Sequence, residues 1–312
     1  MKSSHNCPPD GSFAQPHKLA PNFEWLLLQT VMQDLTYIDE MSRRVEDNGI
    51  DSEEQYFKEG VNSIKMVKNT EKLGSGGYGQ VYKALDLVKC QMVAIKIESK
   101  DGASSMMVLE GNVLRRFQDS RHCPRFIACG HFGNRIFIVM QLLGSSLSNL
   151  RRLQPGHKFT IGTTARVAVE AIEAIRDLHA IGYVHRDVKP SNFAIGYDSY
   201  KCRTLYLLDF GMSRRYKEKN GSHRPQREMV GFRGTVRYAS LTTHEKMDLG
   251  RKDDLTSLFY VLFEMIAGHL PWRYAKEKSE VATLKLMCSP PILCESLPPQ
   301  FLSYVAHLSA LK

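Results

Sequence analysis

The sequence predicts an α+β protein with two lobes, because strand-like and helix-like patterns occupy different parts of the chain. From Ile64 onward, short strand-like runs are each bounded by glycine or charged residues, which is typical of a small antiparallel sheet. Beyond about Leu147, apolar residues recur at the three-to-four-residue spacing of helices, as in 163–182 and 255–268. A β-rich part followed by an α-rich part indicates two lobes with a cleft between them.

Length and charge narrow the class of protein. The chain has 312 residues, of which 43% are apolar, which is enough to bury a full core. Its net charge of +9 is uneven, since residues 1–60 hold five Lys/Arg against eleven Asp/Glu and the rest of the chain therefore carries +15. A basic body indicates an anionic partner, which could be nucleic acid, a membrane surface or an acidic or phosphorylated protein. Seven cysteines without a C-x-x-C pair indicate reduced thiols.

The N-terminal region is predicted to be separate from the lobes. Residues 1–20 are rich in Pro, Ser, His and Gly, which predicts a flexible tail, and residues 21–60 predict an acidic amphipathic helix that Asn22 could cap. This extension could dock on the basic body, bind another protein or cover the sheet. No apolar run nearby is long enough for a signal peptide or a membrane span. We therefore expect a location in the cytoplasm, and the nucleus is an additional candidate.

A glycine-rich stretch, LGSGGYGQVY from Leu73 to Tyr82, follows the first predicted strand. Its glycines fit G-x-G-x-x-G-x-V, a weak signal that a hairpin turn would also explain. It lies between two strand patterns, whereas a dinucleotide-binding fingerprint would pass from a strand into a helix. The context favours a flap between strands, whose backbone N–H groups can approach phosphates.

Two charged residues follow in apolar surroundings. Lys96 is the only charge in the strand run VAIK, and a buried lysine needs an anionic partner. Glu110 lies 14 residues further on, in the first helical pattern after the sheet. We expect these two side chains to form an ion pair.

The stretch YVHRDVKPSNFAIG, Tyr183–Gly196, interrupts an apolar run with charges. Alone, it could be a charged surface loop. It fits H-R-D-x-K-x-x-N from His185 to Asn192, however, and D-F-G begins at Asp209. A glycine flap, a strand lysine, a helix glutamate, this loop and D-F-G in this order match the signature of protein kinases. The resemblance implies a bilobal protein-kinase fold, with a small β-rich N-lobe that contains one helix and a larger helical C-lobe.

The resemblance points to a smaller group of kinases in the segment where most kinases carry A-P-E. The string GFRGTVRYAS, Gly231–Ser240, is similar to the casein kinase one group. Within that group, the strings VMQLLGSSLSNLRRLQPGHKFT, KPSNFAIG, GRKDDLTSLFY and GHLPWR resemble the tau-tubulin kinase branch, including its nematode and insect relatives. The similarity covers 61–312, with an N-lobe of about 61–143 and a C-lobe of about 144–312. The family continues through one or two more helices, so we expect uncovered apolar surface near Lys312.

The resemblance implies ATP and Mg²⁺ as cofactors. The residues implied at the ATP site are Leu73, Gly74, Ser75, Gly76, Gly77, Tyr78, Gly79, Val81, Ala94, Lys96, Glu110, the gatekeeper Met140 and the hinge residue Leu143. Lys96 would bind the α and β phosphates. Phosphoryl transfer depends on positioning and charge neutralisation more than on covalent chemistry.

The catalytic roles follow from the same resemblance. Asp187 would orient the substrate hydroxyl and accept its proton, and Lys189 would face the migrating phosphoryl group. Asn192 and Asp209 would hold two magnesium ions through oxygen ligands. Asp254 would brace the catalytic loop.

Substrate choice is predicted from charge. Between Arg214 and Arg237 there are eight Lys/Arg and two Glu, which favours acidic or phosphorylated peptides over a merely solvated basic loop. The resemblance also implies that Arg237, Gly268 and Lys276 form an anion pocket beside the active site.

The sequence therefore predicts an active protein serine/threonine kinase that prefers acidic or phosphate-primed protein substrates, which could include cytoskeletal proteins. The alternative is a pseudokinase-like scaffold that recruits partners without turnover. We expect a monomer without membrane insertion. We expect no nucleic-acid binding, because the sequence has no recognition helix, zinc spacing or stacking motif.

Overall fold

The computed structural model describes residues 66–76, 79–86, 89–99, 104–132, 135–198, 203–218 and 220–311. All of them belong to one compact unit, Asp51–Lys312. The predicted tail 1–20, the predicted helical extension 21–60 and the expected start of the sheet at 61–65 lie outside the described residues. Two residues of the glycine stretch, Gly77 and Tyr78, also lie outside them.

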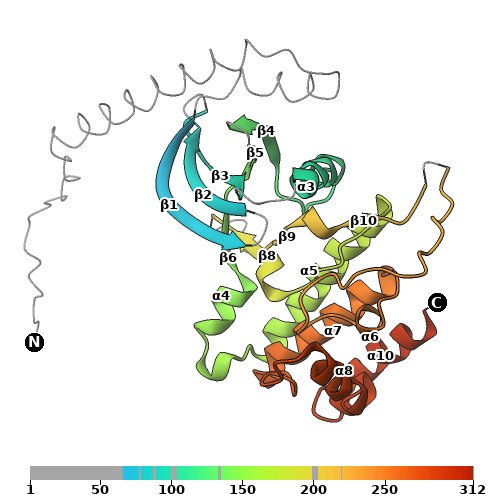
Figure 1. The fold of residues 1–312 in the computed structure, drawn as a ribbon. Coiled ribbons are helices and arrows are strands. Elements are labelled where there is room, and N and C mark those ends of the chain that lie inside the picture. Colours follow the sequence, from blue (N-terminus) through green and yellow to red (C-terminus); the bar gives the residue numbers. More distant parts are fainter. Residues whose placement is uncertain are drawn as a thin grey trace, which may run out of the picture. The chain divides into compact units, whose positions relative to one another are not determined.

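In the first lobe, the described residues form an antiparallel sheet with one helix. Its elements are β1 (Met66–Gly76), β2 (Gly79–Asp86), β3 (Gln91–Glu98), α3 (Ser104–Arg116), β4 (Phe126–Phe132) and β5 (Arg135–Gln141). The strand order is β1-β2-β3-β5-β4, and α3 packs against β4 and β5 (Figure 1). This arrangement confirms the predicted small β-rich lobe with one helix.

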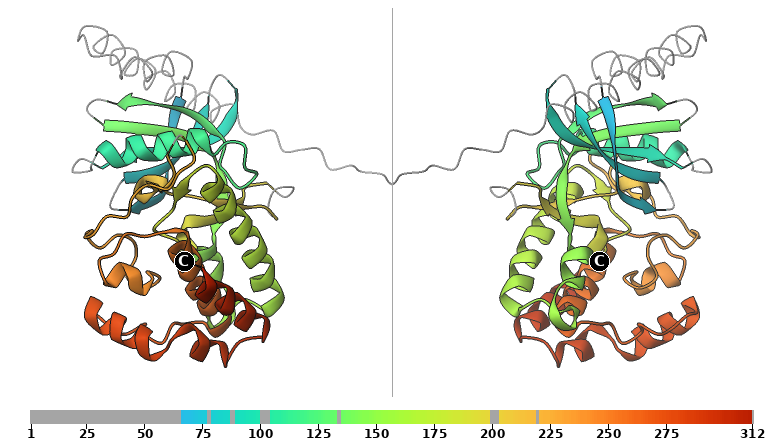
Figure 2. Two further views of the ribbon diagram at one scale, coloured as in Figure 1. Left: turned by 90° about the vertical axis from the view of Figure 1, so that its right-hand side faces the viewer. Right: turned by 90° about the vertical axis from the view of Figure 1, so that its left-hand side faces the viewer.

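The second lobe is mainly helical. Its helices are α4 (Leu147–Arg152), α5 (Ile161–Ala180), α6 (Leu241–His244), α7 (Arg251–Ala267), α8 (Lys278–Met287), α9 (Pro290–Cys294) and α10 (Gln300–Ala310). The sheet lies at one end of the unit and the helices lie at the other (Figure 2). Helix α7 packs against α5 and is buried along most of its length, so it forms the centre of this lobe.

The helical lobe also contains short strands that the sequence pattern did not predict. They are β6 (Leu143–Ser146), β7 (Tyr183–Val184), β8 (Phe193–Gly196), β9 (Leu205–Leu207) and β10 (Arg214–Arg215). Runs of two to four residues are too short to show an alternating pattern. Strands β6, β8 and β9 form one sheet, and β7 pairs with β10. These pairings fix both ends of the loop 185–192 and the residue that follows β9.

The C-terminal helices cover part of α7. The Tyr304 hydroxyl of α10 donates to the Leu255 carbonyl at 2.9 Å, and the Tyr304 ring stacks on Phe259. Exposed apolar side chains occur on α8, α9 and α10; they are Leu286, Met287, Ile292 and Leu302. Within the described ranges, no helix combines the length and the apolarity that crossing a lipid bilayer requires.

Candidate active site

Lys96 lies on β3, and its ammonium group joins three elements. Its Nζ is 2.9 and 2.6 Å from the two carboxylate oxygens of Glu110 on α3, and 2.9 Å from Oδ1 of Asp209, two residues after β9. Burial alone would lower the pKa of Lys96, but the charges of Glu110 and Asp209 raise it above its ordinary value. The lysine is therefore charged. The ion pair with Glu110 is present as predicted, and Asp209 is an additional partner.

Asp209 begins a turn that places Phe210 in the interior. The Asp209 backbone has a φ of 65°, in the left-handed region. Phe210 is 1% exposed and packs edge-on against Phe117 and His185, at ring-centroid distances of 5.6 and 5.7 Å. Burial alone would raise the pKa of Asp209, but the Lys96 charge lowers it below its usual range. Phe210 thus anchors the turn, and Asp209 presents an ionised carboxylate.

Asp254 holds the start of the catalytic loop, residues 185–192. Its carboxylate accepts the backbone N–H groups of His185 and Arg186, both at 2.8 Å, and lies 2.8 Å from Nε2 of His179. Arg186 has a φ of 67°, which costs free energy for a residue with a side chain. Burial alone would raise the pKa of Asp254, but the hydrogen bond and charge of His179 lower it. This geometry suits the bracing role that the resemblance implied.

Asp187 receives hydrogen bonds from two directions. Lys189 Nζ donates to Oδ2 at 2.5 Å, and Thr235 Oγ1 donates to Oδ1 at 2.7 Å. Thr235 belongs to the activation segment, which comprises residues 209–240. The amide of Asn192 donates to the Asp187 carbonyl at 2.9 Å. The three predicted catalytic residues are therefore neighbours, and Thr235 is a contact that the sequence reasoning missed.

Gly234 allows the activation segment to reach Asp187. It has a φ of 100°, and a Cβ added there would lie 2.6 Å from the Arg186 carbonyl oxygen. No side chain fits so close to a backbone oxygen. A glycine is therefore required for Thr235 to contact Asp187.

The residues predicted at the ATP site are placed by the register of the sheet. Val81 pairs with Lys96 across β2 and β3, and Ala94 pairs with Met140 across β3 and β5. Leu143, the predicted hinge residue, begins β6 directly after Leu142. The exposed end of β1 carries the remaining predicted residues, namely Leu73, Gly74, Ser75 and Gly76. The sheet thus gathers most of the predicted set near the Lys96 strand.

The glycines of the glycine-rich stretch differ in the space around them. A Cβ at Gly74 or Gly76 would meet no atom within 4 Å, so both border open space. A Cβ at Gly79 would lie 2.5 Å from the Ile97 carbonyl oxygen. Gly79 is therefore needed for packing between β2 and β3, whatever it contributes to ligand binding.

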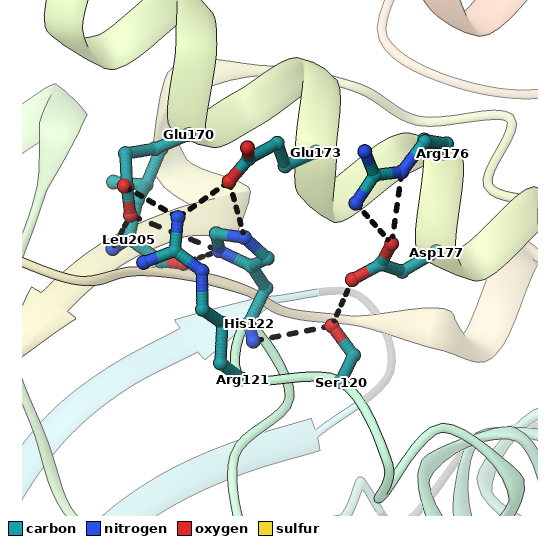
Figure 3. A network of polar contacts seen from close by, with 8 residues as sticks. All are labelled: Ser120, Arg121, His122, Glu170, Glu173, Arg176, Asp177 and Leu205. Atoms are coloured by element: carbon teal, nitrogen blue, oxygen red, sulfur yellow. Dashed lines mark hydrogen bonds and ion pairs between the residues drawn. The ribbon is translucent and has the colours of Figure 1, made fainter.

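The loop between α3 and β4 fastens the first lobe to α5 (Figure 3). Ser120 Oγ donates to Asp177 Oδ2 at 2.8 Å, and Arg121 forms ion pairs with two glutamates of α5. Between them, His122 is fully buried, and its Nδ1 lies 2.8 Å from the Leu205 carbonyl oxygen. These contacts fix the C-terminal end of α3, and hence Glu110, relative to the catalytic loop.

Comparison with known proteins assigns this geometry to a family. A family model described as "Protein kinase domain" matches residues 67–300. The chain belongs to the protein kinase family. The matched range holds every site residue discussed above.

Two relatives are similar to this kinase domain. One is a probable serine/threonine-protein kinase of Dictyostelium discoideum, 44% identical over 241 residues, which cover 77% of this chain and 49% of the relative. Another is a putative casein kinase I of Caenorhabditis elegans, 39% identical over 216 residues, which cover 68% of this chain and 63% of the relative. The chain therefore spans about half the length of the first relative and less than two thirds of the second.

A protein kinase domain uses ATP and, typically, a divalent metal ion. The donor set here fits such an ion. Asp209 offers an ionised carboxylate, and the Asn192 amide uses its nitrogen as a donor to Asp187, so its oxygen is not taken up by that bond. Within the described part of the chain, no group of three or more His, Cys, Asp or Glu could hold a metal. A site with two protein ligands suits an ion that is also bound by nucleotide phosphates.

Each of the three residues predicted to form the kinase's anion pocket has its own polar partner in the protein. Arg237 Nη1 lies 3.2 Å from the buried carboxylate of Glu264. Gly268 caps the same helix, α7, and its carbonyl oxygen accepts a hydrogen bond from Arg151 at 3.0 Å. Lys276 is exposed, and its backbone N–H donates to Glu280. Arg237 and Gly268 thus lie around the C-terminal end of α7, and an anion-binding role for all three residues stays a prediction.

Sequence reasoning missed several charged residues that the kinase domain buries. Lys285 of α8 is fully buried and donates to the carbonyl oxygens of Val236 and Ala239 at 2.7 and 2.6 Å. Glu264 accepts a hydrogen bond from the Tyr238 hydroxyl at 2.6 Å, in addition to its contact with Arg237. Each is the only charge within an apolar helical run, which was an available signal. Their partners are not predictable from spacing.

Proposed function

We propose that this chain is a protein serine/threonine kinase that transfers the γ-phosphoryl group of ATP to Ser or Thr hydroxyls. Asp187 would orient the hydroxyl and accept its proton, while Lys189 would stabilise charge on the transferred group. Lys96, held by Glu110, would bind the α and β phosphates. Asn192 and Asp209 would hold Mg²⁺, which would neutralise the phosphate charges when bound.

One observation carries this proposal. Lys96 contacts Glu110 and Asp209 at the same time, so α3, β3 and the turn after β9 are joined at one ammonium group. Active kinases require this lysine–glutamate pair and the metal-binding aspartate to be in place together. A scaffold without turnover has no need for this arrangement, so the geometry favours an active enzyme.

Substitution of Asp187 by Asn tests the catalytic assignment. The change removes the proton acceptor but keeps the shape, so we expect kcat to fall on the order of 10²–10⁴-fold, with ATP binding nearly intact. Phosphate transfer to casein or tubulin and ATP-induced thermal stabilisation with magnesium would be measured together. Asp119→Asn, at an exposed turn, is the matched control. Full activity in Asp187→Asn contradicts the assignment, and a wild type that binds ATP without turnover supports the scaffold.

We further propose that the substrates are acidic or phosphate-primed proteins, in line with the tau-tubulin kinase branch and its cytoskeletal targets. Arg237 is partly exposed at the end of α7, and Lys276 is exposed. Guanidinium and ammonium groups make short, charge-assisted hydrogen bonds with phosphate. We also propose that the protein is a monomer and does not bind nucleic acid. We propose that it works in the cytoplasm, with the nucleus as the second candidate. Localisation of the tagged full chain in cells would test where it works.

A further inference from the structure

Four arginines lie around Asp248 at the base of the activation segment. Arg186 comes from the catalytic loop, while Arg214, Arg227 and Arg233 come from the segment itself. Burial lowers the pKa of Arg186 to about 10, and the positive charges of the other three arginines add to the effect. Like charges repel one another, so an anion among these arginines stabilises the segment in this place.

Asp248 supplies an anion at this point. It lies in the loop before α7, and its side chain is 6% exposed. Its Oδ1 accepts a hydrogen bond from Arg227 Nη2 at 3.0 Å, its Oδ2 accepts the Arg227 backbone N–H at 3.2 Å, and it forms an ion pair with Arg214. Arg186 and Arg233 line the same small pocket. One carboxylate thus ties the start and the middle of the activation segment to the loop that leads into α7.

Many kinases place a phosphate among such arginines. Phosphorylation of the activation segment orders it, because the phosphate pairs with arginine side chains. Asp248 makes the same kind of charge-assisted contact with a carboxylate. It lies beyond the end of the segment, so its charge does not depend on any modification of residues 209–240.

Short contacts link the activation segment to Arg186 and Asp187 of the catalytic loop. Arg186 Nε donates to the Met212 carbonyl at 2.7 Å, near the start of the segment. Near its end, Gly234 lies against the Arg186 carbonyl, and Thr235 donates to Asp187. Release of the segment would therefore remove Thr235, the residue that donates to Oδ1 of Asp187.

We propose that Asp248 is a positioning residue whose carboxylate takes the place of an activation-segment phosphate, fastening Arg214 and Arg227 so that Thr235 stays at Asp187 without phosphorylation. The inference rests on the proposed kinase activity. It concerns how the activation segment is held at Asp187, and it makes no claim about the choice of substrate.

Asp248→Asn, assayed after phosphatase treatment, is the first test. The substitution removes the charge and keeps the size, so we expect kcat to fall about tenfold or more, as for loss of one charge-assisted hydrogen bond. The KM for ATP should change much less. Asp248→Glu should keep most of the activity. Glu218→Gln is the matched control, because Glu218 pairs with Arg224 in the same segment but is exposed.

Rescue by a free anion distinguishes positioning from general damage to the fold. Sulfate at tens of millimolar should restore part of kcat in Asp248→Ala, whose shortened side chain leaves room for the anion, whereas chloride at equal ionic strength should not. Wild-type kcat in Asp248→Asn overturns the proposal. A loss that neither Asp248→Glu nor sulfate reverses also overturns it.

A measurement that does not depend on catalysis separates this inference from the proposed function. Amide hydrogen exchange of residues 214–235 should speed up in Asp248→Asn and stay unchanged in Glu218→Gln, even if the wild type proves inactive. If Asp248→Asn does not fold, Arg227→Gln replaces it, because the Arg227 side chain is 51% exposed and tolerates substitution. Unchanged exchange in the folded variant counts against the proposal.

Discussion

At the scale of single residues, Glu264 fixes the position of the Arg237 side chain. Glu264 is 1% exposed, and it contacts Arg237 and Arg151 at 3.2 and 3.4 Å. A buried carboxylate is costly unless it is paired, so two arginines and the Tyr238 hydroxyl surround it. The group of two guanidinium ions and one carboxylate keeps a net positive charge. Arg237 is therefore held in place and still able to attract an anion.

Arg237→Ala and Lys276→Ala should each weaken the use of a peptide phosphorylated three residues before the target Ser or Thr. We expect a loss of roughly 1–3 kcal/mol in kcat/KM, because a charge-assisted contact with the phosphate is removed. Raised salt should imitate the effect. The unprimed peptide should lose much less. Comparison of kcat/KM for both peptides checks this, with Arg176→Ala, an exposed arginine of α5 outside the segment, as a control. Equal losses on both peptides would exclude an anion pocket.

The sequence identified residues whose type and spacing are set by chemistry. Lys96 was found because it is a single charge in a strand, and Asp187 because it stands in a fixed motif. Glu264 gave a similar signal in LTSLFYVLFEMIAG, but its partner Arg151 lies 113 residues away. Asp248 gave no such sequence signal, because it is one acidic residue in a polar loop. Long-range pairing depends on the fold, and local patterns do not contain it.

At the scale of elements, the loop between α3 and β4 combines surface and buried contacts. The Arg121 side chain is 55% exposed, whereas His122 lies beneath it and is fully buried. Exposed ion pairs contribute little because solvent screens them. A buried side chain leaves a cavity when it is removed, and here it would also leave the Leu205 carbonyl without its contact. The buried histidine should therefore dominate the stability of this junction.

His122→Ala should lower the free energy of unfolding by about 2–4 kcal/mol, from the cavity and the lost hydrogen bond. Arg121→Ala, its neighbour and control, should cost about 1 kcal/mol or less. Urea unfolding of both variants measures the difference. A larger cost for Arg121→Ala would show that the exposed ion pairs hold the junction.

The regular elements were predictable, and the short ones were not. Strands β1 to β3 have eight or more residues each and are bounded by glycine or charged residues, and α5 and α7 each span several turns. Strands β7 and β10 have two residues each and exist only because Tyr183 and Val184 pair with Arg215 and Arg214. Their formation depends on the fold around them.

At the scale of the whole molecule, Lys285 links stability to pH. Burial lowers the pKa of Lys285 to about 7, below the value of 10.5 for a free lysine. Between these two values the unfolded chain holds a proton that the folded chain lacks, so stability rises as pH increases through this range. Below about pH 7 both states are protonated, and the folded state bears the cost of a buried charge.

Lys285→Met should remove this pH dependence. Between pH 7 and pH 9 the Tm of the wild type should rise relative to that of the variant, because only the wild type loses the buried charge. Thermal unfolding at the two pH values, with the exposed-lysine variant Lys89→Met as control, measures the effect. Parallel changes in wild type and Lys285→Met would show that Lys285 keeps an ordinary pKa.

The role proposed for Asp248 has a consequence for control in the cell. An enzyme whose segment is fastened by a genetically encoded side chain is competent as soon as it folds, and no upstream enzyme is needed to start it. The amount made, the rate of degradation and the arrival of a suitable target would then set its output. A rise in synthesis would translate directly into more product, without the delay that a second modifying step introduces.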